Sequence, residues 1–252
     1  MRWNVGIDKD RFEDSESEEA YFIGKYVFIP LSNFFSKILI HTPITPNQLT
    51  IFWGLMMIAS SIAFAFNNYV INIIAGVLWV VSYSLDCTDG TIARYKNIRS
   101  HRGKYYDLIN HRATYPLLMF CIGFGMWQFG RTEFFGFTFD PALYLIMGFL
   151  AGAGMWMIMD LGECHNKAYP NELVENDSGS QYIEGKGVNE RTFFIIMSLN
   201  PLAFTNMMFL LPIFAALKAL DIFILFYGLM YPVVSFARYI ILARDIPARI
   251  TE

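Results

Sequence analysis

The segment Asp86–Arg94 reads DCTDGTIAR, and Gly103, Asp107 and His111 follow it at intervals of one helical turn. This group lies where one strongly apolar segment of the chain ends and the next begins, so we expect it at a membrane surface. Ionisable side chains beside membrane spans are costly unless they are paired or bind a ligand. The segment therefore predicts a functional site rather than a solvated loop.

Helical spacing predicts how these side chains meet, because residues three or four positions apart share a face of a helix. Asp86 and Asp89 have this spacing on the first helix, and the second helix carries Asp107, Asn110 and His111. If the two faces meet, they form a cup of oxygen ligands with one nitrogen. Such a cup suits Mg²⁺ or Mn²⁺, so Asp86, Asp89 and Asp107 are candidate metal ligands and His111 is a further candidate.

Small residues beside the carboxylates predict room for a large ligand. Gly90 and Ala93 leave the helix backbone open to a polyphosphate, and Arg94 can bind phosphate oxygens through its forked guanidinium. The competing interpretation is a structural cluster in which Arg94 and Arg112 neutralise the carboxylates. For His111 the corresponding alternative is a buried histidine whose role is only structural.

Composition bounds the class of protein. The chain has 252 residues, of which 55% are hydrophobic and 17% aromatic, and its charges are confined to short segments. This pattern predicts an integral membrane protein with several spans. The net charge of −3 argues against a nucleic-acid partner, which would favour a basic face. The cysteines are few and scattered, so no disulfide framework is expected; they are Cys87, Cys121 and Cys164.

The predicted fold is an all-α integral membrane protein with six transmembrane helices after an N-terminal interfacial amphipathic helix. The six apolar stretches are residues 47–66, 69–94, 104–128, 140–161, 191–217 and 220–243. The first span has three agreeing start signals: Thr45 as N-cap, Pro46 at the first helical position and Gln48 in the capping-box position.

Four regions follow from this pattern. They are a polar tail over 1–20, the interfacial amphipathic segment over 21–44, the six-helix domain over 45–244 and a cytoplasmic tail over 245–252. The first twenty residues contain no apolar core of the kind that a cleavable signal peptide has.

The basic residues predict the orientation. With both termini in the cytoplasm, all but two of the 19 lysines and arginines fall on the cytoplasmic side. The two exceptions are Arg131 and Lys218. We therefore expect a protein of the cell (inner) membrane whose Asp86–His111 cluster faces the cytoplasm, where soluble nucleotides are found.

The cluster resembles the signature of the CDP-alcohol phosphotransferase (CDP-alcohol phosphatidyltransferase) family, D-x-x-D-G-x-x-A-R followed after eight residues by G-x-x-x-D-x-x-x-D. The matching residues are Asp86, Asp89, Gly90, Ala93, Arg94, Gly103 and Asp107. Six spans behind an interfacial helix also resemble that family. The resemblance implies a metal-dependent homodimeric enzyme of phospholipid biosynthesis, which moves a phosphoalcohol or phosphatidyl group from a CDP-linked donor to an acceptor hydroxyl and releases CMP.

The last position of the signature departs from the family, because His111 stands where the family has a fourth Asp. That Asp is a metal ligand and the general base in the family, and a neutral imidazole can also act as a base near neutral pH. The resemblance implies catalytic roles for His111 and Arg94. It implies substrate binding by Thr45, Pro46, Asn47, Gln48, Gly90, Ala93, Arg94, Ser100 and Gly103.

Two other functions are compatible with the sequence. One is a catalytically silent relative that binds lipid or nucleotide or acts as a scaffold, having lost turnover with the fourth Asp. The other is a small ion-coupled transporter that uses the intramembrane carboxylates, although the Gly and Arg positions of the signature count against it. The donor and the acceptor are left open, since lipid-linked and soluble CDP-alcohols share the same signature.

Overall fold

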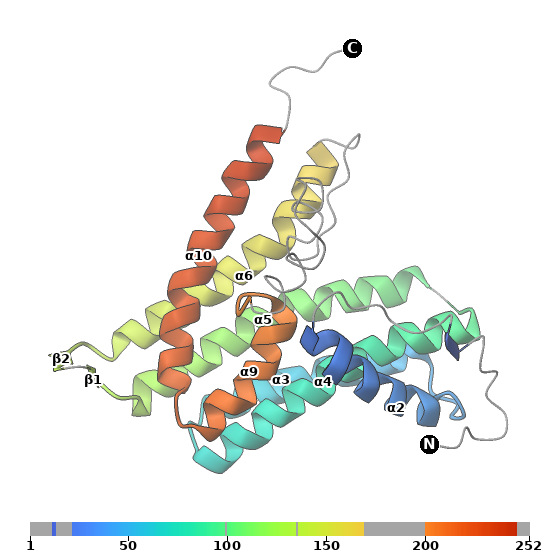
Figure 1. The fold of residues 1–252 in the computed structure, drawn as a ribbon, viewed down its shortest axis with the longest axis horizontal. Helices are drawn as coiled ribbons and strands as arrows, with labels where there is room; N and C mark the ends of the chain where they lie inside the picture. Colours follow the sequence, from blue (N-terminus) through green and yellow to red (C-terminus); the bar gives the residue numbers. More distant parts are fainter. Residues whose placement is uncertain (1–11, 14–21, 99, 135, 169–199, 246–252) are drawn as a thin grey trace.

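The computed structural model describes residues 12–13, 22–98, 100–134, 136–168 and 200–245, and this part of the chain is almost entirely helical (Figure 1). The helices are η1 (Gly24–Phe28), α2 (Ile29–Leu39), α3 (Pro46–Phe64), α4 (Tyr69–Lys96), α5 (His101–Phe129), α6 (Ala142–Ala168), α9 (Phe204–Ala216) and α10 (Leu220–Asp245). Two short antiparallel strands, β1 (Glu133–Phe134) and β2 (Phe137–Thr138), lie between α5 and α6.

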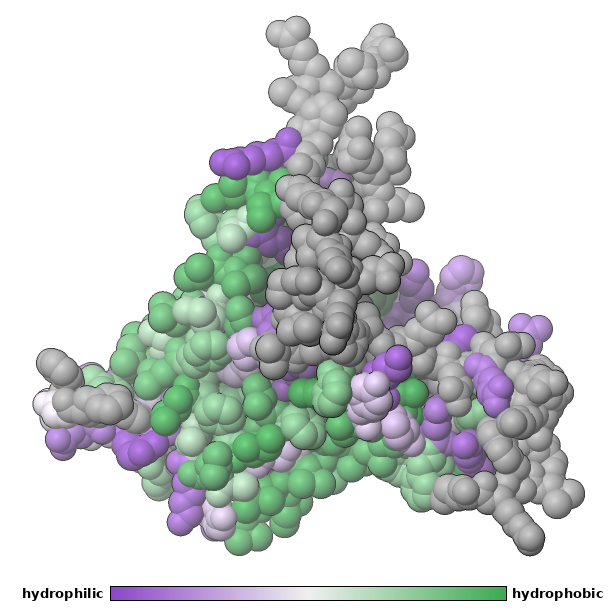
Figure 2. Space-filling view, viewed as in Figure 1, coloured by the Kyte–Doolittle hydropathy of each residue, from purple (hydrophilic) through white to green (hydrophobic). Residues whose placement is uncertain are grey.

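Within the described residues, four helices are long and apolar enough to cross a membrane. They are Pro46–Phe64, Tyr69–Lys96, Ala142–Ala168 and Leu220–Arg244. Large apolar side chains on two of them are well exposed, including Phe149, Leu229 and Phe236, as expected for a surface that contacts lipid. Figure 2 shows this apolar surface over the body of the molecule, with hydrophilic residues collected at its edges. The chain is a multi-pass membrane protein.

The remaining two predicted spans are less complete. Helix α5 covers the third predicted span, but its first half carries the charged residues of the motif. Helix α9 covers only the second half of the fifth span, and at about 1.5 Å per residue it is shorter than a bilayer core of roughly 30 Å. The rest of that span, together with the predicted tails, falls outside the described residues. Six spans therefore stay a prediction.

Local caps fix the helix ends nearest the motif. Thr45 and Gln48 form the predicted capping box at the start of α3: Gln48 N donates to Thr45 Oγ1 at 3.3 Å and Thr45 N donates to Gln48 Oε1 at 3.0 Å. Asn97 ends α4 in the left-handed conformation, and Ser100 caps α5 by accepting from Gly103 N. The chain therefore reverses direction between the two halves of the motif within a few residues.

The packing of the helices places the motif inside a three-helix unit. Helix α3 packs against both α4 and α5, while α2 and α9 pack on α4. Helix α6 packs between α5 and α10, and in Figure 1 α6 and α10 run side by side away from the other helices. The contact between α5 and α6 is close because Gly123 and Gly148 face each other there.

The segment before α3 packs on α4 near the motif. Its buried residues recur every fourth position, at Gly24, Phe28, Ser32 and Ser36. The hydroxyls of Ser32 and Thr88 lie 3.2 Å apart, which joins this segment to the motif helix. An interfacial position for the segment stays a prediction.

Candidate active site

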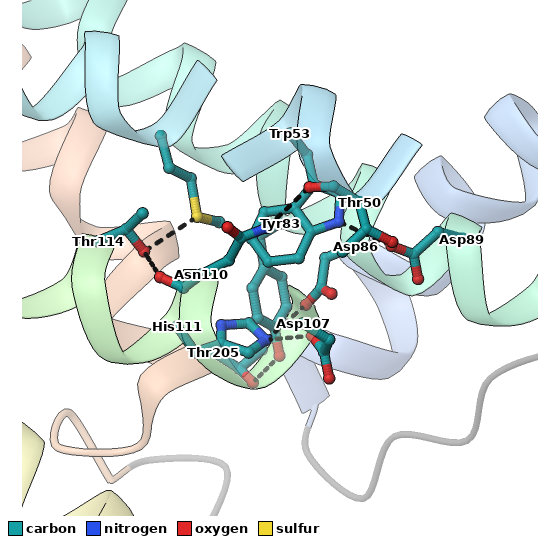
Figure 3. Close-up of polar contacts among 11 residues, drawn as sticks. Thr50, Trp53, Tyr83, Asp86, Asp89, Asp107, Asn110, His111, Thr114 and Thr205 are labelled. Carbon is teal, nitrogen blue, oxygen red and sulfur yellow. Dashed lines mark hydrogen bonds and ion pairs between the residues drawn. The ribbon is translucent and has the colours of Figure 1, made fainter. Parts of the chain in front are cut away.

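His111 lies between two of the motif carboxylates (Figure 3). Its Nε2 is 3.0 Å from Asp107 Oδ1, one turn earlier on α5, and 3.4 Å from Asp86 Oδ2 on α4. The candidate ligand atoms of these three residues all lie within 4.8 Å of one another. The structure thus brings together Asp86, Asp107 and His111 as one cluster from two helices.

Asp89 points toward a third helix. Its Oδ2 accepts hydrogen bonds from Thr50 Oγ1 at 2.5 Å and from Trp53 Nε1 at 2.8 Å, both on α3. It still lies close enough to Asp86 and Asp107 to interact with them electrostatically. The sequence placed all three carboxylates in one cup between two helices, whereas the structure adds α3 as a third wall.

Thr50 and Trp53 are site residues that the sequence analysis missed. They occur in an apolar segment, three positions apart, and neither carries a charge that would draw attention. The buried Trp53 ring also lies beside the imidazole of His111, with ring centroids 5.2 Å apart, and Tyr115 lies on another side at 5.2 Å. Asn110 Nδ2 donates to Thr50 O at 2.8 Å, which holds α5 against α3 directly behind the carboxylates.

A cavity of about 470 Å³ opens beside the carboxylates. It is lined by Pro46, Asn47, Thr50, Asp89, Gly90, Ala93, Arg94, Ile98, Ser100, His101, Gly103, Lys104 and Asp107. Most of the predicted substrate-binding residues are therefore around one space, together with two of the predicted metal ligands. Thr45 and Gln48 are not among the lining residues, because their side chains bond to each other's backbone in the capping box.

The walls of the cavity come from three helices. Ser100 Oγ donates to Asn47 Oδ1 at 3.2 Å and accepts from Gly103 N at 3.0 Å, so it joins the starts of α3 and α5. A Cβ at position 103 would lie 2.7 Å from Asn47 Oδ1, so any larger residue there would displace the Asn47 side chain. The first turn of α5 borders the cavity, and helix N-termini attract phosphate groups.

Two basic side chains add positive charge to this cavity. Arg94 lies against Gly90, where a Cβ would be 3.2 Å from Arg94 Nη1, and its Nη2 is 3.4 Å from Thr91 Oγ1. Lys104 lines the opposite side, on α5. A space of this size with carboxylates at one end and cationic side chains along its walls suits a metal-bound polyphosphate.

The cluster fits a divalent cation. Two carboxylate oxygens and an imidazole nitrogen converge on one region, and Mg²⁺ or Mn²⁺ is commonly held by a few such ligands together with phosphate oxygens and water. Nε2 of His111 faces the carboxylates. The other ring nitrogen, Nδ1, is buried and has no hydrogen-bond partner among the described residues.

An ion-pair network supports the cluster from the side of α6. Arg112, the residue after His111, donates from Nε to Asp160 Oδ1 at 2.7 Å and from Nη2 to Glu163. Lys167 extends the network to Glu163 at 2.8 Å. Arg112 therefore binds α6 rather than the motif carboxylates, and it does not neutralise them.

Comparison with known proteins agrees with this geometry. No curated protein matches the chain at a significant level. Residues 43–161 match the family model described as CDP-alcohol phosphatidyltransferase, and that range contains every residue that lines the 470 Å³ cavity as well as Asp86 and His111. Over residues 43–161 the chain is therefore similar to the CDP-alcohol phosphatidyltransferase family, a family of transferases.

Proposed function

We propose that this protein transfers a phosphoalcohol or phosphatidyl group from a CDP-linked donor to an acceptor hydroxyl and releases CMP, in the biosynthesis of phospholipids or related lipids. One observation carries the proposal: the cavity beside the carboxylates is lined by both halves of the family signature and by Pro46 and Asn47 of α3. A cavity of about 470 Å³ is within the range of small-molecule and cofactor sites.

Asp86, Asp89 and Asp107 would hold a Mg²⁺ or Mn²⁺ ion. His111 would stay outside the ligand set, which leaves its Nε2 able to accept a proton. When bound, such a cation neutralises the charge that develops on the donor pyrophosphate as its phosphoanhydride bond breaks. Asp89 keeps its orientation because Thr50 and Trp53 both donate to the same oxygen. That leaves its other oxygen for the cavity, which Asp89 lines.

The donor's phosphates would bind between Arg94 and Lys104, with the first turn of α5 beneath them. Arg94 stabilises the charge on the leaving CMP, because a guanidinium can bind two phosphate oxygens at once. Gly90 and Ala93 let the donor approach the α4 backbone. Asn47, Ser100 and Gly103 form the rim where we place the nucleotide.

The chemical step balances as a single substitution at phosphorus. The acceptor oxygen bonds to the β-phosphorus of the donor, the bond from that phosphorus to the CMP oxygen breaks, and the acceptor hydroxyl loses its proton. We assign that proton to Nε2 of His111. Asp107 lines the cavity and also contacts Nε2, so it lies on the route between the acceptor and the imidazole.

Release of CMP tests the proposal. Purified protein in detergent should release CMP from a CDP-linked donor only when an acceptor and Mg²⁺ or Mn²⁺ are present, and Asp89→Asn should abolish the release. Two donors, CDP-diacylglycerol with soluble alcohols and CDP-ethanolamine with diacylglycerol, would show which half of the donor is the lipid. Ion-driven flux without CMP release from any donor would instead indicate the transporter.

A second candidate function is supported by the position of His111. Its imidazole already contacts two of the carboxylates that would hold the cation, so these groups can satisfy one another without a metal. A protein of that kind would bind CDP-linked donors or lipids without turning them over. Binding of a CDP-linked donor without CMP release would favour this function.

We place the site and both termini in the cytoplasm and expect a homodimer in the cell (inner) membrane.

A further inference from the structure

A second cavity, of about 500 Å³, lies at the other end of the bundle. Its walls come from the turn between α3 and α4, the end of α5, and the turn between α9 and α10. Tyr69 of this cavity and Asp89 of the motif are separated along α4 by roughly 30 Å, at 1.5 Å per residue. That distance is about the thickness of a bilayer core, so if α4 spans the membrane the two cavities lie near opposite surfaces.

The charged residues that line this cavity are Arg131, Lys218 and Asp221. Arg131 donates to the buried carboxylate of Asp221 from Nε at 2.5 Å and from Nη2 at 2.8 Å. The hydrogen bond to Asp221 raises the pKa of Arg131, so the guanidinium stays charged and offsets the charge of the carboxylate. Lys218 then leaves one positive charge, which matches the single negative charge of a phosphodiester.

The Lys218 ammonium has no anionic partner within the described part of the chain. It lies over the ring of Tyr69, 4.7 Å from the ring centroid. Its backbone has φ 54°, a left-handed conformation in which glycine is favoured and a lysine costs free energy. Lys218 and Arg131 are also the two basic residues that the predicted topology puts on this side of the membrane, where lysines and arginines are scarce.

Asn72 supplies an unsatisfied hydrogen-bond acceptor in the same wall. Its side chain is buried, and its Nδ2 donates to Asn67 Oδ1 at 3.1 Å. Its Oδ1 has no hydrogen-bond partner among the described residues, which is unusual for a buried amide. At the rim, Phe129 and Leu217 are 65% and 71% exposed, so an apolar edge adjoins the polar interior.

We propose that this cavity binds the head group of a phospholipid. Lys218 pairs with the phosphodiester, Asn72 Oδ1 accepts from a hydroxyl or ammonium of the head group, and the acyl chains extend over Phe129 and Leu217 into the bilayer. The proposal does not depend on the chemistry at the motif, since no residue is shared between the two cavities.

The test measures phospholipid binding by the full chain, with native mass spectrometry in detergent as the readout. The probe is phosphatidylglycerol, compared with phosphatidylcholine of the same acyl chains, which lacks a head-group donor. Lys218→Gln removes the positive charge. Lys218→Gly also removes the charge and relieves the strain of the left-handed backbone conformation. Because glycine favours this conformation, Lys218→Gly should unfold no more easily than the wild type. Lys25→Gln, on the exposed side of η1, is the matched control for loss of one lysine.

We expect both Lys218 variants to weaken the binding of phosphatidylglycerol by about tenfold, the effect of losing one charge-assisted hydrogen bond. Lys25→Gln should bind as the wild type does, and phosphatidylcholine should bind more weakly than phosphatidylglycerol. Equal binding by the wild type and both Lys218 variants would overturn the proposal. Displacement of the lipid by inorganic phosphate at comparable concentration would also overturn it, in favour of a free-phosphate site.

Discussion

Trp53 donates a 2.8 Å hydrogen bond from its indole Nε1 to Oδ2 of Asp89. The tryptophan belongs to α3, outside the signature, and its ring also lies beside His111. One fully buried side chain therefore contacts a candidate residue from each half of the motif. We infer that Trp53 positions Asp89 and the imidazole without touching the substrate.

Trp53→Phe should lower activity while preserving most of the packing. The substitution removes one donor from a carboxylate and keeps an aromatic ring at the position. Hydrogen bonds to charged groups contribute about 1.5–3 kcal/mol, so we expect kcat/KM for CMP release to fall by about ten- to a hundredfold. Steady-state kinetics of CMP release, with the donor and the metal varied separately, measures this.

Trp79→Phe is the control. Trp79 is fully buried as well, but its Nε1 has no hydrogen-bond partner in the described part of the chain, so the variant loses ring area without losing a hydrogen bond. The two variants should unfold at similar temperatures and differ in kcat/KM. Equal losses of activity in both would show that Trp53 contributes only packing.

Variants of His111 distinguish a role as general base from a role as metal ligand. His111→Ala should lower kcat by about a hundredfold or more, because general bases typically contribute a factor of 10²–10⁴. His111→Asp restores the family residue, so we expect it to remain active and to bind the divalent cation more tightly through the added negative charge. The measurement is CMP release as a function of Mn²⁺ concentration.

His41→Ala, at an exposed position before α3, controls for the loss of any histidine. If His111→Ala releases CMP at the wild-type rate while Asp89→Asn releases none, His111 is not the base. If His111→Asp raises turnover well above the wild type, the natural histidine instead marks a site with reduced activity.

Gly148→Ala should destabilise the fold. A Cβ at position 148 would lie 2.8 Å from the backbone oxygen of Met119 and 3.0 Å from Cα of Gly123, and backbone atoms cannot move aside without separating α5 from α6. Overpacking of this kind costs about 1–3 kcal/mol. Thermal unfolding in detergent measures it, with the exposed Ala153→Leu on the same helix as control. Equal unfolding temperatures for the two variants would contradict the close contact.

The sequence predicts what local interactions determine. The capping box at Thr45 depends on neighbours within a few residues, and the structure confirms it. The pairing of Asp107 with His111 likewise follows from one turn of helix. The resemblance to the family, predicted from the spacing of the signature, is confirmed by the match over residues 43–161.

The direction of Asp89 was not predictable in the same way. Residues three apart on a helix differ by about 60° around its axis, so Asp86 can face α5 while Asp89 faces α3. Which helix stands there is a matter of tertiary packing. Thr50 and Trp53 occur in an apolar span whose composition predicts only a membrane helix, so their hydrogen bonds to Asp89 required the structure.

Ion pairs between residues far apart in the chain could not be predicted from the sequence either. Arg112 pairs with Asp160 and Glu163 on α6. Helix α6 continues to Ala168, past the predicted span end at residue 161. Arg131 and Lys218 were assigned to one side of the membrane by counting basic residues. That they share a cavity depends on where the turn between α9 and α10 packs.

Anomalous X-ray scattering from Mn²⁺ in crystals grown with CDP would locate the cation directly. We predict a peak within coordination distance of Asp86 and Asp107, with the CDP phosphates extending from it toward Arg94. The Asp107→Asn variant should lose that peak. Ordered CDP in the cavity without a Mn²⁺ peak between Asp86 and Asp107 would contradict a metal-dependent phosphotransferase.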